Sequence, residues 1–423
     1  MTGHRPVAGG VGQAATKRIR AIEAGADDIF ARRAGPVLSG TNLVRAGDHN
    51  QRVTLHAVRI NGPVTRNDIA AMTGLTGASI ANITKRLLRD GLILEAGRSR
   101  GGRGAPSTKL VINPDGCFSV GLNVDRDHIT LVVLDFVGKV RARSSHEIAF
   151  AGPETVRVFF QRSIGRLLAR AQVPRDRLIG VGVAFPDDIA QAHLPDQPGD
   201  YAAWAHVRVD DLIRDVLGVA VFVENDAAAA AIGEMQFGLG QQYRSFFYVL
   251  VTAALGGGLV VDDNYFRGAD GRSGEIGWLR AIDSSGTNTQ LQNIVSLSAL
   301  YARLASHGFR VHSPSGLTQL EPEARGVVDS WVLESSNALV ESLLAVNCLI
   351  NPEAILIGGR LPAMLVDQLA TSLNAGMRRF ATQVPTIATV ARAATANDAP
   401  AVGAAILPFS DRFLPTRLAL LKG

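Results

Sequence analysis

The amino-acid sequence predicts an α/β protein whose body consists of two lobes of similar design, preceded by a winged helix-turn-helix. Residues 50–112 carry the pattern of helix, short turn, helix and glycine-arginine hairpin that is typical of winged helix-turn-helix domains. After residue 113, an order of three strands, a helix and a further strand occurs twice, which indicates a duplicated α/β body. We therefore expect a cleft between the two lobes.

Composition and turn signals divide the 423 residues into four parts. We expect a mobile basic arm at residues 1–40, a winged helix-turn-helix at 41–112, a first lobe at 113–225 and a second lobe at 226–423. The C-terminal helix of the second lobe is able to return to the first. The turn cluster Asn113-Pro114-Asp115-Gly116 marks the joint between head and body. For the arm, ordering into a helix on binding and an inert tail remain equally open.

Composition excludes several protein classes. Hydrophobic residues make up 47% of the chain and charged residues 19%, as in ordered soluble proteins. No uninterrupted apolar run reaches the roughly 18 residues that a membrane span requires, and no secretory signal follows the basic N-terminus. Cys117 and Cys348 are far apart, which argues against a disulfide scaffold and a cysteine zinc cluster and predicts a cytoplasmic protein.

Charge is distributed unevenly along the chain. Residues 1–112 contain 17 Lys and Arg against 7 Asp and Glu, whereas the remaining 311 residues contain 26 against 31. A basic N-terminal part on an acidic body is typical of a nucleic-acid-binding module joined to another domain. The arginine-rich composition of a GC-rich genome could produce the same bias.

The helix-turn-helix is predicted from caps and apolar periodicity. The first helix occupies residues 50–61 and ends before Gly62-Pro63. The second begins at Thr65, where Thr65 and Asp68 form a loose capping box, and Gly74 ends it. Thr76 then opens a third helix that extends to about Asp90.

The outer face of the third helix and the hairpin tip predict a DNA interface. Small residues at a helix N-terminus allow close approach to a phosphate, Asn can pair with adenine, and Lys or Arg with phosphate or guanine. Arginines in a wing can follow phosphates or the minor groove. The candidate DNA-binding residues are Thr76, Ser79, Asn82, Lys85, Arg86, Arg98, Arg100 and Arg103. There are two alternatives. The hairpin tip could be a merely basic loop in solvent, or the winged helix could be used only for protein contacts.

The body is predicted from buried β-branched runs that alternate with helices. In the second half, a glycine-rich turn at residues 253–258 is expected between two strands. The expected strands are 118–123, 129–135, 140–148, 178–185, 221–223, 246–252, 259–262 and 354–357, and the expected helices are 154–171, 297–306 and 327–351.

The polar elbow Glu224-Asn225-Asp226 lies between a buried strand and an alanine-rich helix. A carboxylate just past the carboxyl end of a strand is where α/β proteins hold small polar ligands. Asp is also a good N-cap residue, so Asp226 could serve only to cap the helix. The elbow alone does not decide between a ligand site and a cap.

Four motifs in residues 41–409 resemble the ROK family of repressors, open reading frames and sugar kinases. They are GVGVAFP, VENDAAAAAIGE, RGADGRSGEIGWL and NPEAILIGG. The resemblance implies an actin-like ATPase fold, and the winged helix-turn-helix implies the repressor branch. It also implies that Asp226 matches the kinases' general base and that Asn225 and Glu275 match residues that hydrogen-bond sugar hydroxyls.

Both phosphate-binding loops depart from the family pattern. The first, Asp-x-Gly-Gly-Thr in the kinases, is Asn123-Val124-Asp125-Arg126-Asp127 here. The second, Gly-Thr-Gly, is Thr252-Ala253-Ala254. Side chains in place of glycines block the close backbone approach to phosphates, and carboxylates repel them. We therefore expect no kinase activity and no ATP cofactor.

The sugar-binding and zinc motifs are also altered. The family's His after Glu-Ile-Gly is Trp278, a contacting Glu is Gln292, and Ala228 replaces a frequent Asn. Residues 284–292 contain no Cys or His, so we expect no metal site there. Trp278 could stack on a sugar or fill the core. The candidate ligand-binding residues are Asn225, Asp226, Glu275, Trp278 and Gln292.

The combined pattern predicts a transcriptional regulator of carbohydrate-related genes. We expect it to bind a palindromic DNA operator as a homodimer or homotetramer, without membrane association, and to respond to a small carbohydrate effector. A carbohydrate kinase with an appended DNA-binding head is the first alternative. A regulator that has lost small-molecule control is the second.

Overall fold

The computed structural model describes residues 43–98, 107–187, 189, 199–269, 271–395 and 398–415. Residues 50–415 form one compact unit, which contains both the winged helix-turn-helix and the two lobes. The predicted arm at 1–40 lies outside the described residues, and so do Arg100 and Arg103 of the predicted wing.

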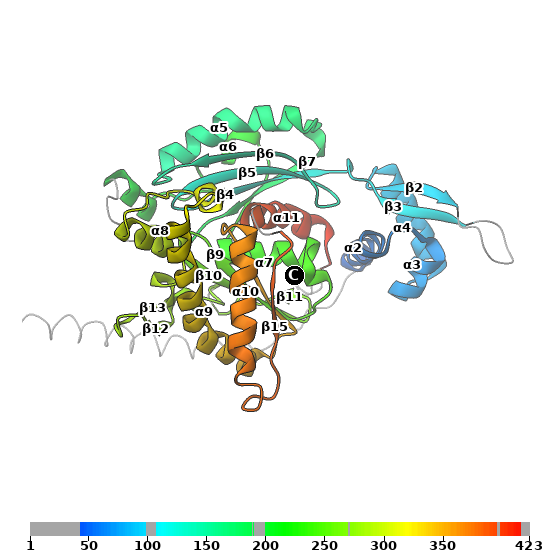
Figure 1. Ribbon diagram of the computed structural model, residues 1–423. Coiled ribbons are helices and arrows are strands. Elements are labelled where there is room, and N and C mark those ends of the chain that lie inside the picture. Colours follow the sequence, from blue (N-terminus) through cyan, green and yellow to red (C-terminus); the bar gives the residue numbers. More distant parts are fainter. Residues whose placement is uncertain are drawn as a thin grey trace, which may run out of the picture. The chain divides into compact units, whose positions relative to one another are not determined.

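The head contains the predicted helix-turn-helix and a three-stranded sheet of order β1-β3-β2 (Figure 1). Thr65 and Asp68 form the predicted capping box, Gly74 ends the second helix with φ 70°, and Thr76 caps the third. The elements are α2 (Leu43–Asn61), β1 (Val64–Thr65), α3 (Arg66–Thr73), α4 (Gly77–Arg89), β2 (Ile93–Arg98) and β3 (Thr108–Ile112).

The first lobe is built on a five-stranded sheet of order β6-β5-β4-β7-β8. The first three strands form an antiparallel meander, and β7 and β8 add in parallel. Helix α5 covers one face of this sheet (Figure 1). The elements are β4 (Phe118–Val124), β5 (His128–Asp135), β6 (Val140–Glu147), α5 (Pro153–Arg170), β7 (Leu178–Ala184), α6 (Arg214–Leu217) and β8 (Val221–Glu224).

The second lobe repeats this topology with the order β11-β10-β9-β14-β15. Again a meander is extended by two parallel strands, which confirms the predicted duplication. Its elements are α7 (Asp226–Phe237), β9 (Phe246–Val251), β10 (Leu255–Val261), β11 (Asn264–Tyr265), β12 (Arg280–Ile282), β13 (Asn288–Gln290), α8 (Leu297–Ser306), α9 (Pro322–Ile350), β14 (Ala354–Gly359), α10 (Ala363–Arg378), β15 (Thr389–Arg392) and α11 (Ala399–Phe413).

Helices α7 and α11 pack against each other between the two sheets (Figure 1). Helix α11 lies on β4 and β7, whereas α7 lies on β9 and β10. Their crossing has no room for larger side chains, since a Cβ at Gly403 would lie 1.7 Å from the Ala229 carbonyl oxygen. A Cβ at Gly182 would lie 1.8 Å from the Ala404 carbonyl oxygen. Small residues therefore bring these backbones into direct contact.

The prediction of a glycine-rich turn at 253–258 is wrong, because strand β10 already begins at Leu255. The glycines serve close packing instead. A Cβ at Gly258 would lie 2.6 Å from the Ala231 Cβ of α7, and a Cβ at Gly257 would lie 2.4 Å from the Gly274 carbonyl oxygen. They thus let α7 and the segment that carries Glu275 pack closely onto the strand.

Among the described helices, α9 alone has the length and apolar composition that a membrane span requires. Charged residues such as Asp329, Glu334 and Glu341 interrupt its apolar sequence, so α9 contains no uninterrupted apolar run of that length. One side of α9 is buried in the core of the second lobe through Trp331, Leu339 and Leu343. That burial is typical of a core helix.

Candidate functional site

All five predicted ligand residues line one pocket at the first turn of α7. They come from segments that are distant in the chain: the β8–α7 elbow, the segment before β12 and the turn after β13. The lining residues are Arg126, Pro186, Asp187, Asn225, Asp226, Ala227, Thr252, Ala254, Leu255, Gly256, Gly257, Glu275, Trp278 and Gln292. Its polar side chains, with one aromatic ring, are the groups that bind small polar molecules.

Asn225, and not Asp226, is the N-cap of α7. Its side-chain oxygen accepts hydrogen bonds from the backbone N–H groups of Ala227 (2.9 Å) and Ala228 (3.1 Å). Asp226 is the first helical residue, and its carboxylate accepts from the Ala227 N–H (2.8 Å). The interpretation of Asp226 as the cap is therefore wrong. The Asp226 carboxylate belongs to the pocket wall at a helix N-terminus, where negative charge is stabilised.

Two residues that sequence analysis missed connect the pocket's polar groups. The Asn225 amide donates to an Asp187 carboxylate oxygen at 3.2 Å. Arg272 Nε lies 3.5 Å from that carboxylate and 3.8 Å from the Glu275 carboxylate. Asp187 follows the GVGVAFP strand and Arg272 lies in the RGADGRSGEIGWL segment, so the motifs held the signal, although no spacing rule joined them.

Glu224, the last residue of β8, fixes the backbone of the elbow. Its side chain is buried, one carboxylate oxygen accepts from the Asn225 backbone N–H at 3.2 Å, and the other pairs with Arg267. Because a buried carboxylate is costly unless it is paired, these contacts explain why an acidic residue ends strand β8. They orient the backbone from which Asn225 and Asp226 project.

Trp278 lies at the pocket and not in the core. Its side chain is 45% exposed, so of the two interpretations the core-filling one is wrong. Gln292 is half-buried beside it, and its amide donates to the Gln290 side-chain oxygen at 2.8 Å. An indole ring open to solvent next to amide and carboxylate groups can stack on an apolar ring face while the polar groups bind hydroxyls.

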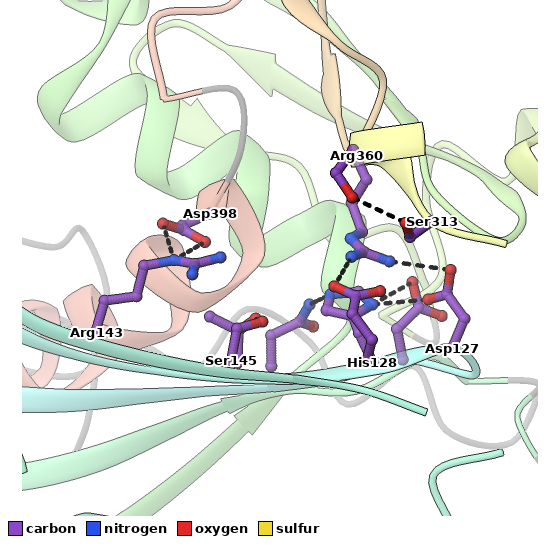
Figure 2. A network of polar contacts seen from close by, with 12 residues as sticks. Asp127, His128, Arg143, Ser145, Ser313, Arg360 and Asp398 are labelled. Carbon is purple, nitrogen blue, oxygen red and sulfur yellow. Dashed lines mark hydrogen bonds and ion pairs between the residues drawn. The ribbon is translucent and has the colours of Figure 1, made fainter. Parts of the chain in front are cut away.

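The first altered phosphate loop takes part in a polar network between the lobes, which Figure 2 shows. Arg360, directly after β14, donates to Asp127 at 3.0 Å and also pairs with Glu147. The His128 ring contacts the other Asp127 oxygen at 2.8 Å. Burial alone would raise the pKa of Asp127, but the His128 hydrogen bond and the Arg360 charge outweigh it and lower the pKa. Asp127 is thus a charged partner of the opposite lobe.

The ligand atoms of Asp125, Asp127 and His128 lie within 4.8 Å of one another, a grouping that could hold a cation. The Arg360 guanidinium already supplies positive charge to this group. Asn123 contacts the His128 ring at 3.0 Å. These contacts describe an internal ion-pair cluster.

The second altered loop uses its backbone within the protein. The Thr252 N–H donates to the Ala254 carbonyl at 2.9 Å, and the Thr252 carbonyl accepts from the Leu297 N–H at 2.8 Å. The Ser298 hydroxyl donates to the Ala253 carbonyl at 2.6 Å. The Thr252 N–H is thus already engaged and is not presented to a phosphate, which would require it to be open.

The predicted DNA-binding residues that the structure describes lie mostly on the outside of the head. Asn82, Lys85 and Arg86 are exposed on the side of α4 opposite its buried Ile80, Ile83 and Leu87. Arg98 is exposed at the end of β2. Thr76 is exposed but caps α4, accepting from the Ser79 N–H at 3.3 Å. Its hydroxyl also donates to the half-buried Ser79 at 3.0 Å. Arg66, which was missed, ties α3 to α4 by donating to Thr84 at 2.9 Å.

Comparison with known proteins gives one matching family model and several relatives. The model described as "ROK family" matches residues 119–410. The xylose repressor of Bacillus spizizenii is 26% identical over 58% of this chain, and the match spans 63% of that protein. The DNA-binding transcriptional dual regulator NagC of Escherichia coli K12 is 23% identical over 77% of this chain and 85% of its own length.

Among solved structures, a ROK family transcriptional regulator described as a homolog of the E. coli MLC protein shares the fold. The TM-score is 0.62 at 19% identity, and the match covers 90% of this chain and all of the other. The likeness extends over the head as well as the body.

Proposed function

The chain belongs to the ROK family, and on this premise we propose that it is a DNA-binding transcriptional repressor controlled by a small carbohydrate. One observation carries the proposal: a single compact unit contains both an exposed recognition-helix face and a polar pocket lined by all five predicted ligand residues. Two relatives, a xylose repressor and the transcriptional dual regulator NagC, support it.

The effector is a monosaccharide or a close derivative that occupies the pocket at α7. The carboxylates of Asp226 and Glu275 accept hydrogen bonds from sugar hydroxyls, Gln292 and the Asn225 amide add donors, and Trp278 stacks on the ring. Such a ligand can change the affinity for DNA only as far as its own affinity differs between the DNA-binding conformation of the protein and the other conformation.

On DNA, helix α4 enters the major groove and the wing follows the backbone. A homodimer or homotetramer matches the two-fold symmetry of a palindromic operator. Asn82 and Ser79 contact base edges, whereas Lys85, Arg86 and the wing arginines Arg98, Arg100 and Arg103 contact phosphates. The protein acts in the cytoplasm, where its operator and effector are found.

The deciding experiment measures binding of purified protein to DNA from upstream of its own and adjacent genes by fluorescence anisotropy. We expect sequence-selective, salt-sensitive binding that D-xylose, N-acetylglucosamine or its 6-phosphate weakens. If binding is equal on that DNA and on random DNA at every salt concentration, the proposal is wrong.

A pair of variants distinguishes residues that contact phosphates from residues that contact base edges. Replacing Arg98 by Ala weakens binding on all sequences and lowers the salt slope by about 1, whereas Asn82→Ala relaxes the sequence preference. Arg162→Ala, an exposed arginine on α5, is the control for loss of one positive charge. Equal losses on specific and random DNA for both head variants would contradict this assignment.

A carbohydrate kinase with a DNA-binding head is the second candidate, and the Asp226 carboxylate in the pocket favours it. The Arg360–Asp127 pair and the engaged Thr252 N–H oppose it. We propose that the protein is not an enzyme. A coupled ADP-release assay with glucose, xylose and N-acetylglucosamine should show no turnover, and turnover that disappears in Asp226→Asn would establish the kinase.

A regulator without small-molecule control is the remaining alternative. Calorimetric titration of the protein with neutral sugars, amino sugars and sugar phosphates decides it. We expect binding by at least one of them, weakened in Glu275→Gln. Absence of heat with every sugar, in a protein that still binds its operator, would favour this alternative.

A further inference from the structure

We propose that α7 is the mechanical link between the effector pocket and the DNA-binding head, with Arg59 of α2 as the coupling residue. The inference rests on the proposed function and adds a route by which occupancy of the pocket reaches DNA. It stands on contacts at both ends of one helix: the pocket at the first turn and the Arg59 guanidinium at the last.

At its N-terminal end, α7 is part of the pocket. Asn225, Asp226 and Ala227 all line it, and Asn225 caps the helix through two hydrogen bonds. A ligand that bonds to the Asn225 amide or the Asp226 carboxylate thus acts on the end of the helix itself. The displacement that it causes is a movement of α7 along or across its axis.

Helix α7 is built to move as one piece. Its 12 residues span about 18 Å at 1.5 Å per residue. The side chains of Ala227, Ala230 and Ala231 are fully buried against the second sheet. On its other side, a Cβ at Gly233 would lie 3.1 Å from the Gly403 Cα of α11. A helix whose packed faces consist of alanine and glycine has few side-chain degrees of freedom there, so it transmits a displacement and does not absorb it.

At the C-terminal end, Arg59 binds α7 by three contacts. One guanidinium nitrogen donates to the Gln236 carbonyl at 3.0 Å, and the other donates to the Gln236 side-chain oxygen at 2.6 Å. The guanidinium also lies 5.2 Å from the centre of the Phe237 ring. Burial lowers the pKa of Arg59 to about 10, which leaves it charged at pH 7, and a cation is favoured at a helix C-terminus.

Other polar contacts between the head and the body do not involve α7. Arg52 of α2 donates to the Asp411 and Leu414 carbonyls at the end of α11. Arg177 of the body donates to the Asp90 carbonyl after α4. Among the hydrogen bonds and ion pairs of the described residues, those from the head to α7 all come from Arg59. Because the hydrogen bonds of Arg59 reach α7 and those of Arg52 and Arg177 do not, we assign the coupling between pocket and head to Arg59.

A cavity beside this contact leaves room for movement. Val58 and Arg59 of α2, Ile112 of β3, and Phe237 and Gln241 of the body are among its lining residues. Since the junction is not filled at this point, a shift of Gln236 and Phe237 can reposition α2 without compressing the core. Helix α2 in turn packs on the helix-turn-helix through Leu55 and Val58.

The test compares Arg59→Gln and Gln236→Ala with wild type and with the matched control Arg52→Gln, which loses the arginine contact to α11 instead. Operator affinity is measured with and without the sugar that weakens wild-type binding most among D-xylose, N-acetylglucosamine and its 6-phosphate. We expect operator affinity without sugar and sugar affinity to stay within about threefold. The sugar's effect on operator binding should fall from about tenfold or more, a typical coupling, to below twofold in both coupling variants and remain in Arg52→Gln.

Coupling is reciprocal, so operator DNA alone provides a second readout. Trp278 is the exposed tryptophan, whereas Trp204 and Trp331 are buried. Operator DNA should change the fluorescence of wild type but not of Arg59→Gln, and Trp278→Phe identifies the signal. Retention of the wild-type sugar effect and fluorescence change in both coupling variants overturns the inference. Wild type that binds no DNA selectively overturns the proposed function instead.

Discussion

At the scale of single residues, the pocket shows how one side chain can both cap a helix and line a cavity. The Asn225 oxygen is used by two backbone N–H groups of α7, while its amide nitrogen donates to Asp187. Asp226, at the first position of the helix, keeps its carboxylate at the pocket wall. Asn225 thus both caps the helix and lines the pocket, whereas Asp226 lines the pocket with a carboxylate.

Trp278 provides the residue-scale prediction for binding. Because its ring is 45% exposed, Trp278→Ala should leave the melting temperature within about 1–2 °C while weakening effector affinity about 3- to 10-fold, the range expected for loss of an aromatic contact. Isothermal calorimetry measures the affinity. Leu349→Ala, which truncates an 82% exposed side chain far along α9, is the control. Unchanged affinity in Trp278→Ala would remove this residue from the site.

His56 provides a prediction for the pH dependence of stability. Burial, and then the charge of Arg59, lower the pKa of His56 to about 4 from 6.5. The unfolded chain therefore binds a proton at higher pH than the folded one. The free energy of unfolding should fall as the pH drops from about 6.5 to 4, by an amount on the order of 2–3 kcal/mol. Urea unfolding of wild type and His56→Gln at several pH values measures it, and equal slopes for both would contradict the prediction.

At the scale of elements, the helix ends of the head are determined by local hydrogen bonds. Thr65 and Asp68 cap α3 reciprocally, with the Thr65 N–H donating to the Asp68 carboxylate at 2.9 Å. Helix α4 has only the Thr76 side chain as its cap. In both cases the bonds join residues three positions apart, so the sequence alone was sufficient to place them.

The caps lead to a prediction for the stability of the head. Thr65→Ala removes both the cap and the hydroxyl bond to Asp68 and should lower the free energy of unfolding by about 1–2 kcal/mol. Thr76→Ala, with a single cap, should cost about 1 kcal/mol or less. Urea titration followed by circular dichroism compares the two. A greater loss for Thr76→Ala than for Thr65→Ala would show that the reciprocal box adds nothing.

At the scale of the whole molecule, Arg360 joins the two lobes through two carboxylates of the first lobe. It contacts Asp127 and Glu147 across 233 and 213 positions of sequence. Arg143 on β6 similarly pairs with Asp398 at the start of α11, at 2.8 Å (Figure 2). Charged side chains far apart in the sequence thus hold elements of the body together.

Removal of Arg360 should therefore loosen the body. Arg360→Gln leaves Asp127 without its partner and should lower the free energy of unfolding by about 2–3 kcal/mol, since the pair is largely withdrawn from solvent. The folded-state pKa of Asp127 is lowered, so this difference should narrow as the pH falls below about 4. Arg392→Gln, which breaks the exposed pair with Asp367, should cost at most about 0.5 kcal/mol. Equal costs for both variants would rule out a structural role for the inter-lobe pair.

The sequence by itself determined the helix-turn-helix, most of the strands of the two lobes and their duplication and, through motifs that resemble a known family, five of the residues that line the pocket. These follow from periodicity, from caps that span three or four residues, and from motifs at strand ends. The sequence did not distinguish the glycines of β10 from turn glycines, because a glycine needed for close packing has the same sequence signal as one needed for a turn.

Only the tertiary structure decided which distant groups are partners. It placed Trp278 at the pocket, brought Asp187 to Asn225 and Arg272, paired Arg360 with Asp127, and joined Arg59 to the end of α7. The physical reason is that local hydrogen bonds depend on a fixed spacing along the chain. A contact between residues 177 or 233 positions apart depends instead on how whole helices and sheets pack, and no spacing in the sequence encodes it.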